Sequence, residues 1–267
     1  MSGDYGLCWS PGTSRIPHGD GWLVHTPDGE FLELEPEPGR EHVLRRLLTD
    51  PPTNAEADAE TRELLAALGE HGLVRAATPP RQARVGLTGQ GPLRAAVARL
   101  LADDGAQVVP LADTQTRQLR EVDLLVACAE QLPDRLWCEL DERCAELGLP
   151  WHRAHGEGRR YFVGPLTDGP TTARYGDLRL RRLAASQNPE ELHALWAWLD
   201  AGNEPTPHHD PAGATLAAAL LVADIRAWRE GRTPPGRNVQ FGVDTEDGEV
   251  RRHPVLPIPA DLMREAP

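Results

Sequence analysis

Residues 84–94, Arg-Val-Gly-Leu-Thr-Gly-Gln-Gly-Pro-Leu-Arg, are the stretch that decides the fold. A short apolar strand runs into Gly89-Gln90-Gly91, and Pro92 opens a helix that we predict to end near Asp104. Dinucleotide and ATP folds use this strand–glycine–helix order to place a phosphate at a helix N-terminus. The third glycine of the G-x-G-x-x-G pattern, which allows close packing of helix on strand, is Arg94 here.

The glycine turn has two interpretations. As a nucleotide site it would use Gly89, Gly91 and Asp113, because Asp113 follows Gly89 by 24 positions, near where a ribose-binding carboxylate is expected. Otherwise it is only a tight connection between strand and helix. The chain contains no lysine, which excludes a P-loop lysine and a Schiff-base lysine. The missing lysine and third glycine favour the turn without a ligand.

Composition narrows the class of partner. The net charge of −13 argues against nucleic acid, because binding to phosphates needs a basic face. No apolar run approaches the length of about 20 residues that spans a bilayer, and the N-terminus shows no signal pattern. We therefore expect a cytoplasmic protein that binds neither membrane nor nucleic acid. The four cysteines show no C-x-x-C spacing and are expected to be reduced thiols.

Residues 79–267 alternate between strand and helix patterns, which predicts an α/β Rossmann-like domain. The run Val122–Cys128 is continuously apolar, as is typical of a parallel strand buried on both faces. The other predicted strands are 84–88, 107–111, 150–155, 161–163, 238–243 and 249–253, and the predicted helices are 92–104, 133–147, 189–199 and 212–230.

Residues 1–78 form a separate α+β module that we predict to be winged-helix-like. Gly21–His25 and Phe31–Leu34 are strand-like around the turn Pro27-Asp28-Gly29, and Ser14–His18 can precede them. A helix is predicted over residues 43–48, and a second over Asp58–Leu68.

The strand over residues 31–34 is a candidate peptide-binding edge. Leu32 and Leu34 alternate with Glu33, and the free backbone groups of an edge strand can pair with an incoming extended peptide. We expect Arg62, Leu65 and Ala66, on the second helix, to contact the side chains of that peptide. The alternative is a winged helix that reads DNA. Residues 1–80 carry 14 acidic and 6 basic side chains, which disfavours DNA.

Together the hairpin, the helices and Leu73-Val74 resemble a recognition element of RiPP biosynthesis, the pathway class that modifies ribosomally made peptides. The part after residue 78 resembles the E1-like domain of azoline-forming cyclodehydratases. Two pairs of zinc-binding cysteines mark that family, and the resemblance places Thr172, Tyr175, Leu256 and Ile258 at their positions. It therefore implies that the zinc site has been lost.

The resemblance implies a leader peptide-binding partner protein that presents a precursor's core to a YcaO-type cyclodehydratase, as in thiopeptide and thiazole pathways. On this interpretation we expect no catalytic residues, no cofactor and no metal, and we expect the E1-like part to dock the cyclodehydratase and form a homodimer. The alternative is an E1-like adenylating or NAD(P)-binding enzyme that uses the Gly86–Gly91 turn. A transcription regulator with a sensor domain is a third possibility.

Overall fold

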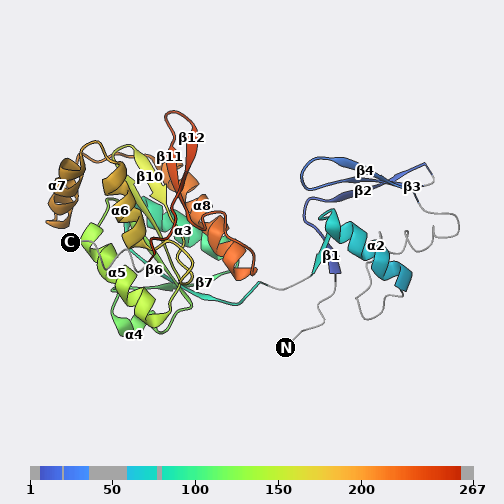
Figure 1. Ribbon diagram of the computed structural model, residues 1–267, viewed down its shortest axis with the longest axis horizontal. Coiled ribbons are helices and arrows are strands. Elements are labelled where there is room, and N and C mark those ends of the chain that lie inside the picture. The colour runs from blue at the N-terminus through green and yellow to red at the C-terminus, as the bar shows by residue number, and fades with distance from the viewer. Residues whose placement is uncertain (1–6, 20, 36–58, 77–79, 260–267) are drawn as a thin grey trace. The chain divides into compact units, whose positions relative to one another are not determined.

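The computed structural model describes residues 7–19, 21–35, 59–76 and 80–259. The chain forms two compact units, Met1–Pro79 and Pro80–Pro267 (Figure 1). They are called the N-terminal unit and the C-terminal unit below, and each is described by itself.

In its described residues the N-terminal unit is an antiparallel sheet with a helix packed against it. Val24 of the sheet, Leu68 of the helix, and Leu73 and Val74 after the helix make the core, because all four are almost fully buried. The three-stranded sheet has the order β2-β3-β4, and β1 and β5 form a separate antiparallel pair. The elements are β1 (Leu7–Trp9), β2 (Ser14–His18), β3 (Gly21–His25), β4 (Phe31–Leu34), α2 (Ala59–Glu70) and β5 (Val74–Ala76).

The predicted strands of this unit are confirmed, while the pairing of β1 with β5 was not predicted. Helix α2 ends two residues later than predicted, and the chain then turns through Gly72, whose φ of +67° suits glycine. The helix predicted over residues 43–48 lies outside the described residues. The described elements do not establish the winged-helix class, which stays a prediction.

The C-terminal unit is built on a seven-stranded mixed sheet of order β12-β11-β10-β9-β8-β6-β7. The strands from β7 to β9 are parallel, and β9 to β12 pair antiparallel in sequence order. β8 lies between β9 and β6, and its apolar sequence is buried as predicted. The strands are β6 (Arg84–Thr88), β7 (Gln107–Pro110), β8 (Leu124–Ala129), β9 (Trp151–Glu157), β10 (Arg160–Val163), β11 (Val239–Asp244) and β12 (Glu249–Pro254).

Helices cover both faces of this sheet (Figure 1). One face packs against α3 and α8 in a core that includes Leu93, Val97, Ala217 and Leu221. The other face packs against α5, α6 and α7. The helices are α3 (Gly91–Asp103), α4 (Thr116–Leu119), α5 (Asp134–Leu147), α6 (Tyr175–Ala185), α7 (Pro189–Asp200) and α8 (Pro211–Arg229). The predicted α/β class is thus confirmed for this unit, and α4 and α6 are helices that the sequence pattern did not predict.

None of the helices in the described part of the chain is long and apolar enough to cross a membrane.

Candidate functional site

Strand β4 is an edge of the N-terminal sheet, since within the described residues it pairs only with β3. The N–H of Thr26 donates to the carbonyl of Glu30 at 2.8 Å, so these two residues form a hydrogen-bonded pair. Such pairs alternate along an antiparallel ladder. Leu32 and Leu34 therefore direct their backbone groups toward β3. Phe31 and Glu33 direct theirs away from the sheet, where a guest strand can pair with them.

The opposite edge, β2, differs because it contains Pro17. On β3, Trp22 and Val24 direct their backbone groups toward β4, so their partners on β2, Pro17 and Arg15, face outward. Proline has no N–H to offer an incoming strand. The ladder available at β2 is therefore interrupted, and β4 is the better edge for a guest.

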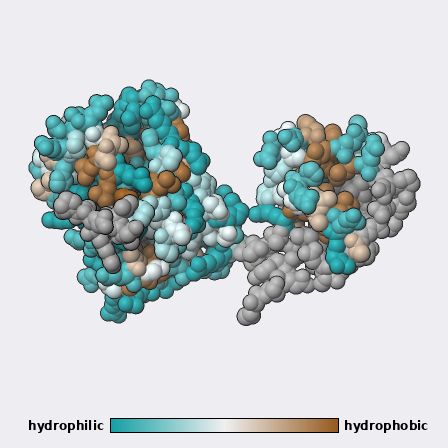
Figure 2. All heavy atoms as spheres, viewed as in Figure 1, coloured by the Kyte–Doolittle hydropathy of each residue, from teal (hydrophilic) through white to brown (hydrophobic). Residues whose placement is uncertain are grey.

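The side chains of β4 separate into two faces. Leu32 and Leu34 are half-buried and pack with the core that also contains Leu64 and Leu68 of α2. Glu33 is exposed and Phe31 is 61% exposed on the other face. Figure 2 shows apolar surface on the visible side of the N-terminal unit. Leu32, Glu33 and Leu34 were the predicted contacts, whereas Phe31, which supplies both outward-facing backbone groups and an exposed ring, was missed.

The three predicted contact residues on α2 are not equivalent. Arg62 and Ala66 are exposed and lie one helical turn apart, so one extended guest can reach both. Leu65 is only 4% exposed and belongs to the buried stripe of the helix. Leu65 is therefore inaccessible to a bound peptide, whereas Arg62 and Ala66 are accessible to one. Whether any of the three contacts a peptide stays a prediction.

The second candidate site is the turn between β6 and α3, at the carboxyl ends of the parallel strands. Gly89 and Gly91 have φ values of +106° and +87°, which glycine adopts most readily. A Cβ on Gly89 would lie 1.9 Å from the carbonyl oxygen of Cys128, so the turn also needs glycine for space. Ligands of open α/β sheets bind outside these strand ends.

A carboxylate of the protein occupies the start of α3. The N–H of Leu93 donates to Oε1 of Glu130 at 3.4 Å, and a Cβ on Gly91 would lie 2.3 Å from the same oxygen. Glu130 and Tyr161 also line a cavity of about 260 Å³. A helix N-terminus attracts anions, and here Glu130 supplies one. A phosphate could bind there only if Glu130 moved or a cation lay between them.

Asp113, the candidate ribose-binding residue, has a structural contact, and the cysteines match the expectation of reduced thiols. The carboxylate of Asp113 accepts from the N–H of Gln115 at 3.0 Å, in a turn ahead of α4. Burial raises the pKa of both Cys128 and Cys144 to about 12, so these thiols are protonated and unreactive at neutral pH. All four cysteines are free thiols, as expected.

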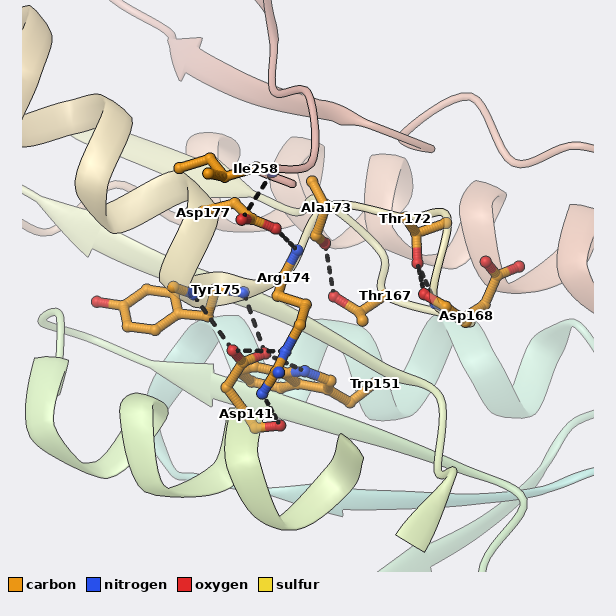
Figure 3. A network of polar contacts seen from close by, with 12 residues as sticks. Asp141, Trp151, Thr167, Asp168, Thr172, Ala173, Arg174, Tyr175, Asp177 and Ile258 are labelled. Atoms are coloured by element: carbon orange, nitrogen blue, oxygen red, sulfur yellow. Dashed lines mark hydrogen bonds and ion pairs between the residues drawn. The ribbon is translucent and has the colours of Figure 1, made fainter. Parts of the chain in front are cut away.

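The two segments that the resemblance places at the zinc cysteines do lie together (Figure 3). Asp177 joins them, because one of its carboxylate oxygens accepts from the N–H of Ile258 at 3.0 Å and the other from the N–H of Arg174 at 2.8 Å. Nε of Arg181 donates to the carbonyl of Leu256 at 2.8 Å. Hydrogen bonds to Asp177 and from Arg181, both in α6, thus hold the C-terminal segment. Within the described residues no cluster of three or more His, Cys, Asp or Glu is placed to hold a metal ion.

Comparison with known proteins shows similarity in structure only. No protein-family model matches the sequence, and no curated protein matches it. The Escherichia coli protein MccB is 14% identical with a TM-score of 0.61, and the match covers 95% of each chain. A heterocyclase solved with substrate and cofactor is 15% identical with a TM-score of 0.67, over 95% of this chain and 38% of the heterocyclase. The chain has an E1-like fold. The resemblance of the C-terminal unit is confirmed at that level.

One expectation is contradicted by these structures. From its missing lysine and third glycine, the chain was predicted not to be an enzyme. MccB, which shares the fold over nearly the whole chain, is described as a microcin C7 biosynthetic enzyme and has also been solved with ATP. The prediction is wrong because it inferred lost catalysis from two motif positions, although the strand–glycine–helix architecture is retained.

Proposed function

We propose that the chain binds the leader of a ribosomally made precursor peptide as an added strand on β4. It then presents the core of that precursor to a YcaO-type cyclodehydratase for azoline formation. The observation that carries the proposal is the outward-facing backbone of Phe31 and Glu33, together with the exposed positions Arg62 and Ala66 of α2. A winged-helix-like recognition module is the architecture that we infer for this unit.

The structural comparisons support a peptide substrate. MccB has been solved with MccA at 13% identity and a TM-score of 0.60, over 96% of this chain and 98% of MccB, and the heterocyclase was solved with its substrate. MccB is described as a microcin C7 biosynthetic enzyme, and this chain shares the fold of both proteins. The recognition of a leader by β4 and the partnership with a YcaO-type enzyme are our proposals.

The geometry sets the expected affinity. Two outward-facing residues offer two N–H and two C=O groups, worth about 1 kcal/mol each when bonded. Two or three apolar anchors add about 2 kcal/mol each. Association costs at least about 4 kcal/mol. The remainder reaches about 6 kcal/mol, which corresponds to a Kd of tens of micromolar.

Fluorescence polarisation tests this directly. The probe is a labelled leader peptide of a short Cys/Ser-rich precursor, if one is encoded beside the gene of this chain, and a scrambled peptide is the control. We expect saturable binding by the full chain. Absence of saturation up to about 1 mM, the affinity of a contact worth only about 4 kcal/mol, would refute the proposal.

A second candidate function is nucleotide binding at the β6–α3 turn. It is favoured by the positive φ of Gly89 and Gly91 and by MccB structures with ATP and with AMPCPP. Thermal unfolding with ATP and Mg²⁺ tests it, since a ligand of the native state raises the Tm. An unchanged Tm at millimolar ATP would exclude this function.

A further inference from the structure

Strand β12 is a second open edge, on the C-terminal unit. In the described part of the chain it pairs only with β11. The N–H of Val255 donates to the carbonyl of Asn238 at 2.8 Å, so that pair is hydrogen-bonded. Because such pairs alternate along the ladder, Val250 and Arg252 direct their backbone groups away from β11. Pro254 also faces outward, and it ends the available ladder because it has no N–H.

The side chains of β12 favour an acidic guest. Arg251 and Arg252 are consecutive and exposed, so each face of the strand carries a guanidinium. Arg251 pairs with Glu249 at 2.7 Å, and Arg252 lies over the ring of Phe241 at 5.3 Å. An extended peptide with carboxylates at alternating positions would meet a positive charge on either face. Cross-strand pairs of opposite charge stabilise a sheet.

The same charges disfavour a second copy of this chain. In the antiparallel register that uses the outward-facing groups of both Val250 and Arg252, Arg251 of one copy would lie opposite Arg251 of the other. Like charges directly opposite destabilise strand pairing. Basic residues on an edge are also a means of preventing aggregation, so the charges exclude self-pairing while they admit a strand of opposite sign.

We propose that β12 binds an extended acidic segment of a partner polypeptide by strand addition. The site differs from β4 in both sequence position and charge, because β4 carries Glu33 and is followed by Glu35, while β12 carries Arg251 and Arg252. The inference does not depend on leader binding at β4.

Fluorescence anisotropy with the full chain tests the proposal. The probe is the labelled peptide Thr-Val-Glu-Val-Glu-Val-Thr, and the control peptide has lysine in place of both glutamates. Arg252→Pro removes an N–H that faces away from β11, and Arg252→Ala keeps that N–H as the matched control. Glu249→Gln releases Arg251 from its ion pair. Glu33→Pro tests whether the probe binds at β4 instead.

We expect the acidic probe to bind more tightly than the lysine peptide, and Arg252→Pro to weaken it by about 30-fold, with a smaller loss for Arg252→Ala. Glu249→Gln should tighten binding, and Glu33→Pro should leave it unchanged. Equal binding of both peptides, no saturable binding, or a loss caused by Glu33→Pro would overturn the proposal. If Arg252→Pro fails to fold, Val250→Pro takes its place, and the gain from Glu249→Gln decides the matter in a folded variant.

Discussion

The substitution Glu33→Pro separates the outer edge of β4 from the fold of the N-terminal unit. The N–H of Glu33 faces away from β3, so proline removes no hydrogen bond of the sheet. Proline is accepted on edge strands for this reason, and it requires an extended residue before it, which Leu32 in β4 already is. The variant should therefore fold while its edge can no longer donate at this position.

The expected loss of affinity follows from one missing donor. The hydrogen bond itself is worth about 1 kcal/mol, and the guest carbonyl left without a partner adds about 1 kcal/mol or more. A total of about 2 kcal/mol corresponds to a Kd about 30-fold weaker. Glu33→Ala keeps the N–H, so it should change the Kd by less than about threefold.

The assay is fluorescence polarisation with the labelled leader, accompanied by thermal unfolding of each variant. Leu34→Pro is the contrasting substitution, because Leu34 directs its N–H toward β3 and its loss should lower the Tm. The reasoning is refuted if Glu33→Pro keeps the wild-type Tm and binds the leader with unchanged affinity.

Three further predictions concern the C-terminal unit. Glu130→Ala should increase any rise in Tm produced by ATP and Mg²⁺, because it removes the carboxylate at the start of α3. A smaller rise than in the wild type would show that Glu130 helps to bind the nucleotide. Asp177→Ala should lower the free energy of unfolding by about 2 kcal/mol, since two partly buried N–H groups lose their acceptor. Urea denaturation measures this loss, and Asp103→Ala, at an exposed position, is the control. Burial opposes ionisation of Glu157, but His155 and the guanidinium of Arg182 lower its pKa to about 2. The ionised carboxylate therefore contributes up to roughly 3 kcal/mol to the free energy of unfolding. This contribution is present above pH 4.5 and is lost as the pH falls toward 2. Glu157→Gln should make acid unfolding less steep in that range, and an unchanged profile would contradict the assignment.

The sequence predicted the elements whose burial depends on apolar residues. β8 and α8 were recognised because their apolar patterns are long, and their bounds differ from the predicted ones by one or two residues. Helix α6 was missed because its sequence is rich in arginine. Arg179 and Arg182 bond to Asp134 and Glu157, so ion pairs hold a helix that apolar periodicity does not reveal.

In the candidate sites too, the sequence predicts local features but not contacts between residues far apart in the chain. The glycine turn could be read from the sequence because its residues are consecutive and need special backbone angles. The carboxylate of Glu130 could not, because it reaches α3 from a position 37 residues away from its partner Leu93. On β4, alternation identified the strand, but only the observed register shows that Phe31 and Glu33 hold the outward-facing backbone groups.

The proline on β2 has a consequence for stoichiometry. A sheet of three strands has two edge strands. A protein in which both edges are available could bind two peptides or polymerise by edge-to-edge pairing. Pro17 prevents a continuous hydrogen-bond ladder at the β2 edge, so each N-terminal unit should bind a single leader peptide. Isothermal titration calorimetry should accordingly saturate at one peptide per chain.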